Sequence, residues 1–380
     1  MTAFWLSDAT QRLTLSQPFV LDSGEVLPEV EVAYRTWGRL SPAADNAVIV
    51  CHALTGSADA DDWWSGMFGP GKTLDPQQQF IVCSNILGGC YGTTGPTSPA
   101  PDGKPWGYRF PQVTIRDQVR LQIRLADHLG IRRIRFVIGG SMGGMHALEW
   151  ALLDPERVQA VVSIAAAGRH SAWCVAWSEA QRQALASDPL FRDGAYFPGA
   201  LPVKGLAAAR AIAMVTYRSP GSLDARFGRL SGGDVFAAQA AAPDEFAVRG
   251  WLRYHGDELV NRFDANSYLR LLHAMDTHDL GRGRGTYEKV LQGIGVPVLI
   301  GSVASDMLYL PSDQIELASI IPRAELFQIG SLHGHDGFLI DASRFESRVR
   351  AFVQALETHG KGAPVSYVKP RLRWVSHAAG

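Results

Sequence analysis

The chain has 380 residues, of which 46% are hydrophobic and 19% are charged, and its formal net charge at pH 7 is −1. This composition is typical of a globular protein with a large core. It excludes the basic field of a nucleic-acid-binding protein and the acidic tail of a solvating segment.

Cysteine usage and hydropathy indicate the compartment. The four cysteines form no C-x-x-C pair and have no zinc-like spacing with histidine, so we expect a reducing compartment, no disulfide framework and no metal site. The first residues carry no signal-peptide pattern, and no apolar run reaches the roughly 20 residues of a membrane span. These patterns predict a soluble, cytoplasmic protein that has no membrane partner.

Strand and helix patterns alternate along the first part of the chain. The run NAVIVCHAL, which begins at Asn46, is typical of a strand that is buried on both faces. Such alternation predicts an α/β fold with a mostly parallel central sheet and helices on both faces. In chain order we expect strands at 28–35, 46–53 and 80–87, a helix at 115–130, a strand at 134–140, a helix that ends before Pro155, and a strand at 158–168.

The pattern changes at about residue 170. Helical segments then dominate, for example at 205–218 and 235–246, and strand-like runs become scarce. The alternation resumes with strands at 296–302 and 324–330 and helices at 311–320 and 343–360. The sequence therefore predicts an α/β core in two parts, 1–169 and 293–360. A helical lid, 170–292, is inserted between them, and a C-terminal tail, 361–380, follows.

A single serine stands among four glycines between a strand and a helix. The stretch GGSMGG around Ser141 matches G-x-S-x-G in the strand–turn–helix context that a nucleophile elbow requires. Small neighbours allow the tight turn, and the N-terminus of the following helix favours developing negative charge beside the serine. We therefore predict that Ser141 is a catalytic nucleophile.

The serine needs a base and an acid, which follow it in the order acid then histidine in folds built around such an elbow. His335 comes just after the last predicted strand and is preferred to His333, because it directly precedes the expected start of the next helix. Asp306 follows the strand at 296–302 and would orient the imidazole. Asp313 is the rival, although capping of a helix explains it more simply.

An oxyanion hole needs two backbone N–H groups. One is expected from Met142, the residue after the nucleophile. The other is expected from the loop after an early strand, where CHALTG (51–56) makes Leu54 the candidate.

Many short motifs together resemble the homoserine O-acetyltransferase family, an α/β-hydrolase-fold family of methionine biosynthesis. The resemblance extends along most of the chain, including the predicted insertion. The motifs that carry it are CHALTG (51–56), the pair at 63–64, FGPGK (68–72), NILGGCYGTTGP (85–96), GGSMGGM (139–145), TYR (216–218), NRFDANSY (261–268), DLGRGRG (279–285), SD (305–306) and GHDGFL (334–339).

The resemblance implies a ping-pong acyl transfer from acetyl-CoA, a co-substrate, to the hydroxyl of L-homoserine, with no permanently bound cofactor. It assigns substrate binding to Arg210 and Asp336, and Tyr217 is a further pocket candidate. A guanidinium suits an α-carboxylate and a carboxylate suits an α-ammonium. The resemblance also implies a homodimer and a lid that excludes water from the acyl-enzyme.

Three other functions remain open at this point. A carboxylester hydrolase would use the same triad, and an O-succinyltransferase acting on homoserine or serine would differ only in donor and acceptor. A non-catalytic binding protein on this fold is the third, and the intact order of serine, aspartate and histidine argues against it.

Overall fold

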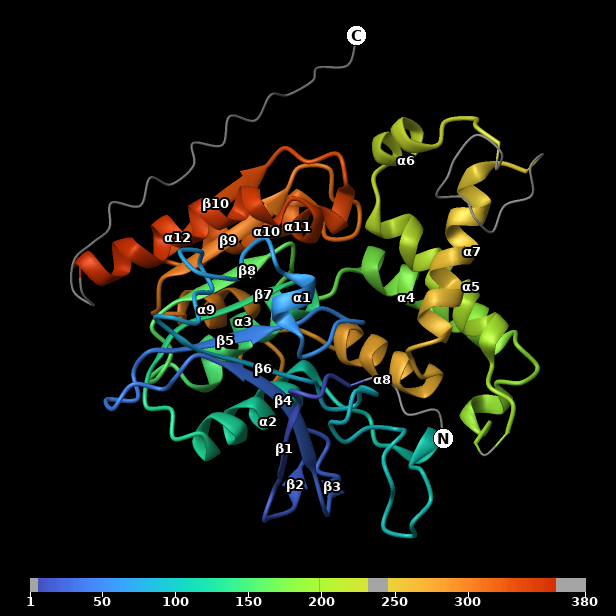
Figure 1. Cartoon of the computed structure of the whole chain (residues 1–380), viewed down its shortest axis with the longest axis horizontal. Coiled ribbons are helices and arrows are strands. Elements are labelled where there is room, and N and C mark those ends of the chain that lie inside the picture. The colour runs from blue at the N-terminus through green and yellow to red at the C-terminus, as the bar shows by residue number, and fades with distance from the viewer. Residues whose placement is uncertain (1–5, 198, 232–244, 360–380) are drawn as a thin grey trace.

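The computed structural model describes residues 6–197, 199–231 and 245–359. Its centre is a sheet of eight strands in the order β1-β4-β6-β5-β7-β8-β9-β10 (Figure 1). Strands β5 to β10 are parallel to one another, whereas β4, near one edge, is antiparallel to both of its neighbours, β1 and β6. The strands are β1 (Gln11–Thr14), β4 (Glu31–Trp37), β5 (Ala47–Cys51), β6 (Phe80–Ser84), β7 (Ile134–Gly140), β8 (Val161–Ile164), β9 (Val298–Val303) and β10 (Ala324–Ile329), and β2 (Phe19–Val20) pairs separately with β3 (Val26–Leu27).

The predicted sheet is confirmed, with differences at the strand ends. The strand expected at 158–168 is limited to β8, because Ala165 adopts a φ of 48°, which no strand residue has. The first expected strand, 28–35, is shifted by about three residues to β4. The short strands β1, β2 and β3 lie in mixed polar sequence with little alternation, and we did not predict them.

Helices cover both faces of the sheet, and two separate apolar clusters lie beneath them. One face carries α2 (Ile115–His128), α3 (Met142–Leu153), α9 (Tyr287–Gln292) and α10 (Pro311–Ile320). The other carries α1 (Ala60–Trp63), α11 (Gly337–Ile340) and α12 (Ala342–His359). Helix α2 begins where Thr114 and Asp117 form a reciprocal capping box. No helix in the described chain combines the length and the apolar character needed to cross a membrane.

The helices between β8 and α9 form a separate group, the helical group, beside the sheet (Figure 1). They are α4 (Ala172–Ala186), α5 (Val203–Tyr217), α6 (Pro220–Arg226), α7 (Ala247–Val260) and α8 (Ala265–Asp276). A third apolar cluster joins this group to the core through Leu54, Met142 and Tyr309. Most of the helix expected at 235–246, and the tail expected at 361–380, lie outside the described residues.

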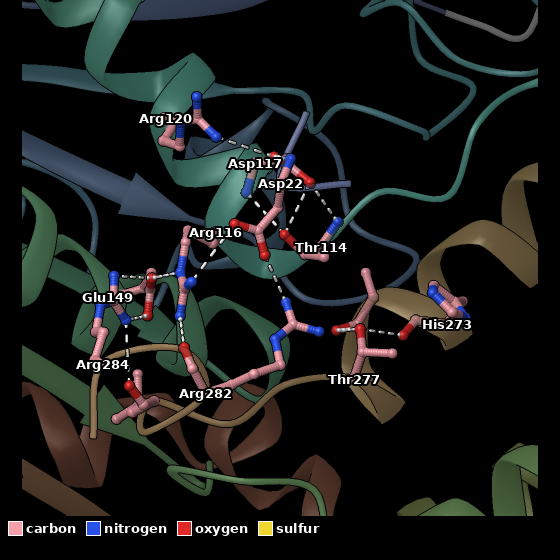
Figure 2. A network of polar contacts seen from close by, with 12 residues as sticks. Asp22, Thr114, Arg116, Asp117, Arg120, Glu149, His273, Thr277, Arg282 and Arg284 are labelled. Atoms are coloured by element: carbon pink, nitrogen blue, oxygen red, sulfur yellow. Dashed lines mark hydrogen bonds and ion pairs between the residues drawn. The ribbon is translucent and has the colours of Figure 1, made fainter. Parts of the chain in front are cut away.

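A network of ion pairs fixes the loop that leads from α8 back to the core (Figure 2). Glu149 of α3, with a side chain only 2% exposed, pairs with Arg116 of α2 and with Arg284 of the loop. Asp22 pairs with Arg282 and Arg116, and Arg116 also donates to the backbone carbonyl of Arg282. The DLGRGRG motif is thus a structural clasp that holds the return from the helical group against α2 and α3.

Candidate active site

The turn at Ser141 is built by contacts that only glycine allows. A Cβ at Gly143 would lie 2.1 Å from the Cys51 carbonyl oxygen, and one at Gly140 would lie 2.4 Å from the Phe338 ring. This packing lets β7 pass directly into α3, with Ser141 at the N-cap and a φ of 58°. A positive φ on a residue other than glycine is strained and requires support from its surroundings. The Ser141 N–H supplies part of that support, because it donates to the Ile164 carbonyl at 2.9 Å.

Three side chains from three strand ends meet at this turn. His335 Nε2 lies 2.8 Å from Ser141 Oγ, and His335 Nδ1 lies 2.7 Å from Asp306 Oδ2. All three residues are buried. They follow β7, β9 and β10, whose carboxyl ends lie at one edge of the sheet, so parallel topology brings together residues up to 194 positions apart.

The two rivals lie elsewhere. Asp313 is in the first turn of α10. Its pKa is raised to about 6, mainly by burial. His333 is half-buried and precedes the short 3₁₀ turn that carries His335. Neither residue is hydrogen-bonded to Ser141, His335 or Asp306 in the part of the chain that the structure describes.

The electrostatics favour a histidine that takes up a proton readily. Burial acts to lower the pKa of His335, but the carboxylate of Asp306, supported by that of Asp336, outweighs burial and raises the pKa above 6.5. With Nδ1–H donated to Asp306 Oδ2, the lone pair of Nε2 faces the Ser141 hydroxyl. This arrangement can remove the serine proton and return it.

Both expected oxyanion donors lie at the site. Met142 is the first residue of α3, so its N–H has no acceptor within the helix. Leu54 lines the same cavity of about 20 Å³ as Ser141. Arg262 Nη1 donates at 2.7 Å both to the Thr55 carbonyl and to the Tyr91 hydroxyl, so the helical group also holds the loop that carries Leu54.

Arg210, Tyr217 and Asp336 lie around His335. The Arg210 guanidinium is 5.3 Å from the centre of the Tyr217 ring, which in turn is 5.8 Å from the centre of the His335 ring. Arg210 Nε and Nη1 are buried and have no hydrogen-bond partner within the described chain. Asp336 Oδ2 forms an ion pair with Arg218 Nε at 3.1 Å. Burial raises the pKa of the Asp336 carboxyl, and the guanidinium of Arg218 opposes that rise.

Comparison with known proteins then places the chain in a family. The model of the alpha/beta hydrolase fold family matches residues 46–341. A homoserine O-acetyltransferase of Trichormus variabilis is 53% identical over 353 residues, which cover 93% of this chain and 96% of that protein. The chain belongs to the homoserine O-acetyltransferase family.

Solved structures agree with this membership and also show how widely the fold is shared. Homoserine O-acetyltransferase of Staphylococcus aureus is 29% identical, with a TM-score of 0.72 over 90% of this chain and 94% of that one. Esterase E22 is 27% identical, with a TM-score of 0.80 over 90% of this chain and 100% of that one. The fold alone therefore does not separate acyl transfer from ester hydrolysis.

Sequence reasoning missed three residues that the structure brings to the site. Arg218 pairs with Asp336, Arg262 holds the loop of Leu54, and the ring of Tyr309 lies 5.4 Å from that of His335. Arg218 and Arg262 lie in the family motifs TYR and NRFDANSY, so their presence there was a usable signal. The position of Tyr309, three residues after Asp306, carries no such signal.

Proposed function

We propose that this protein transfers an acetyl group from acetyl-CoA to the γ-hydroxyl of L-homoserine, a step of methionine biosynthesis. Ser141 is the nucleophile, His335 the general base and acid, and Asp306 the residue that orients the imidazole. The N–H groups of Leu54 and Met142 stabilise the oxyanion. Acetyl-CoA takes part as a substrate.

The proposed reaction has two half-reactions with one base. In the first, Ser141 Oγ attacks the thioester carbonyl while His335 Nε2 takes the hydroxyl proton, and the CoA sulfur leaves with that proton. In the second, His335 takes the proton of the homoserine hydroxyl, whose oxygen attacks the acetyl-serine. The C–O bond to Ser141 breaks, and His335 returns the proton to the serine oxygen.

The observation that carries the proposal is that two guanidinium nitrogens of Arg210, Nε and Nη1, are buried without a partner in the described chain. Buried N–H groups of a charged side chain need acceptors, and the described chain supplies none to Nε or Nη1. A substrate carboxylate would supply an acceptor to these N–H groups in a charge-assisted hydrogen bond. Asp336 follows His335 directly and carries the opposite charge, so an amino acid could place its carboxylate at Arg210 and its ammonium at Asp336.

Burial of the site favours transfer over hydrolysis. Ser141 and His335 are 6% and 3% exposed, and the cavity that Ser141 lines is small. We propose that residues 170–292 act as a lid that keeps water from the acyl-enzyme. An acyl-serine that meets little water survives until the amino-acid hydroxyl arrives.

The test is mass spectrometry of the products from acetyl-CoA or succinyl-CoA with L-homoserine or L-serine. O-acetylhomoserine as the main product is the expected result. Succinylated products would show that succinyl-CoA is the donor. Acylation of free L-serine in place of L-homoserine would show that L-serine is the acceptor.

A carboxylester hydrolase is the second candidate, because the fold is shared with esterase E22. The two functions differ in how CoA release responds to homoserine. We expect homoserine to accelerate release with little acetate formed. Equal release without homoserine, together with stoichiometric acetate, would favour the hydrolase.

Two further expectations concern the whole protein. We propose a homodimer, which sedimentation equilibrium would test, and a cytoplasmic location, which fractionation of cells would test. Neither affects the assignment of the site residues.

A further inference from the structure

The loop that carries Asp306 is held from outside the core. We define the acid loop as residues 304–310, between β9 and α10. Within it, the N–H groups of Leu308 and Tyr309 donate to Asp306 Oδ1 at 2.8 and 3.0 Å, which leaves Oδ2 for His335. The conformation of the acid loop therefore sets the direction of the carboxylate.

The start of α4, in the helical group, bonds to the backbone of this loop. Trp173 Nε1 donates to the Met307 carbonyl at 2.8 Å, and Cys174 Sγ lies 3.2 Å from the Leu308 carbonyl oxygen. These bonds occupy the two carbonyls that follow Asp306. The conformation of the acid loop therefore depends on α4, a helix that lies outside the α/β core.

The side chain of Tyr309 makes a second connection. Its ring lies between His335 and His170, at centroid distances of 5.4 and 5.8 Å. His170 Nε2 is 3.1 Å from the Tyr309 hydroxyl oxygen, and His170 Nδ1 is 3.0 Å from Asp276 Oδ1. Arg182 of α4 completes the chain by pairing with the other oxygen of Asp276.

The charges assign the protons along this chain. Burial opposes ionisation of Asp276, but hydrogen bonds from His170 and Arg182 outweigh it and lower the pKa of the carboxyl. In the tautomer that places the proton on Nδ1, facing Asp276, the Nε2 atom of His170 accepts the Tyr309 O–H. A phenol proton donated to His170 does not compete for the Nε2 atom of His335, which faces Ser141.

We infer that His170 and Asp276 are positioning residues for the acyl transfer, acting through Tyr309 on Asp306 and His335. This inference rests on the proposed function for its reaction but not for its geometry. Asp276, His170 and Tyr309 form a second aspartate–histidine–hydroxyl chain beside the first. Its aspartate and histidine belong to residues 170–292, the helical segment. That segment therefore orients the triad as well as covering it.

The test measures acylation of Ser141 separately from the second half-reaction. Stopped-flow bursts with p-nitrophenyl acetate and with acetyl-CoA give the acylation rate constant from pH 5 to 9. The variants are His170→Phe, which keeps a ring and removes both nitrogens, Tyr309→Phe, which removes only the hydroxyl, and the double variant. Tyr287→Phe is the matched control, because its buried hydroxyl has no hydrogen-bond partner in the described chain.

We expect His170→Phe to slow acylation roughly 10- to 100-fold, as small displacements of reacting groups do. The acidic limb of the rate should move to lower pH, since a misaligned Asp306 raises the pKa of His335 less. KM for homoserine should stay within about twofold, and the control should match the wild type. In the Tyr309→Phe background, the His170 substitution should add little, because the group it acts on is already gone.

Two results would overturn the inference. One is a lowered melting temperature with an unchanged burst rate and pH limb in both single variants. The other is fully additive effects in the double variant. Should His170→Phe fail to fold, the pH limb of Tyr309→Phe still decides the question. A wild type that gives the ester burst but no O-acetylhomoserine would contradict the proposed function and leave this test intact.

Discussion

The core around Ser141 and the helical segment beyond β8 contribute to the site in different ways. The core supplies the groups that react: Ser141, Asp306 and His335 stand at the ends of three parallel strands, where topology alone brings them together. The helical segment supplies residues that surround the reacting groups, among them His170, Arg210 and Arg262. We therefore propose that the core defines the chemistry, whereas the helical segment selects the acceptor and aligns the triad.

The largest effect should come from the core nucleophile. Replacing Ser141 by alanine removes the atom that carries the acetyl group, so we expect turnover to fall by at least about 10⁴-fold. Intact-mass spectrometry after mixing with acetyl-CoA should show no acetyl adduct. An adduct on the variant, or retained turnover, would mean that another residue is the nucleophile.

The acid should come next, and it also tests the pH dependence. His335 must be neutral to accept the serine proton, so acylation should fall as the pH drops through its raised pKa, with an acidic limb above pH 6.5. Asp306→Asn removes the negative charge, which lowers that pKa and moves the limb to lower pH, while the maximal rate falls by roughly 10⁴-fold.

Asp313→Asn is the matched control for this experiment, since Asp313 is a half-buried aspartate at the start of α10 and has its own raised pKa. It should change the rate by no more than a few fold. If the acidic limb moved in Asp313→Asn and did not move in Asp306→Asn, Asp313 would be the acid of the triad.

Within the helical segment, Arg210 should affect the use of the acceptor more than the acylation of Ser141. Arg210→Lys keeps the charge and loses the planar pair of donors, so kcat/KM for homoserine should fall by roughly 10²-fold or more. The acylation burst with acetyl-CoA should stay near the wild-type rate. Arg249→Lys, an exposed exchange on α7 with a side chain 63% exposed, is the control. Equal losses in burst and transfer would show that Arg210 does not select the acceptor.

The smallest effect on activity should come from the clasp that joins the two regions. Glu149→Gln leaves Arg116 and Arg284 without their buried carboxylate, which should cost roughly 3–5 kcal/mol of stability. Urea unfolding followed by tryptophan fluorescence measures that cost, and kcat at 25 °C should change little. Glu316→Gln removes an exposed pair with Arg169 and should change stability by less than about 1 kcal/mol. Similar midpoints for the two variants would contradict a structural role for the clasp.

Local pattern was sufficient for much of the fold and for the reacting groups. Continuous apolar runs and Gly-rich turns predicted β5, β7 and β9, and the elbow context singled out Ser141 before any contact was visible. Short strands and strand ends were missed, because β1 to β3 have few residues and β8 stops at the unusual φ of Ala165. His335 and Asp306 were predicted from chain order, but the choice over His333 and Asp313 had weak local support.

The helical segment was the harder part to predict. Its apolar spacing indicates helices, but the same spacing does not say where a helix packs. Arg210 and Asp336 were assigned by family resemblance, and nothing in their own neighbourhood distinguished them from a solvated arginine and a capping aspartate. His170 and Tyr309 carried no local signal, because the residues that contact one another are far apart in the chain. Asp276 is 106 residues from His170, and Tyr309 is 139 residues from it.

The sequence by itself determined the α/β class, the elbow at Ser141, the order of acid and base, and the family. These depend on spacing within a few residues and on the regular periods of strands and helices. Only the tertiary structure decided that Arg210 Nε and Nη1 are buried without a partner in the described chain, that Arg218 pairs with Asp336, and that His170 links Asp276 to Tyr309 beside His335. The physical reason is that such contacts depend on how α4, α5 and α8 pack against the carboxyl edge of the sheet, which no local pattern encodes.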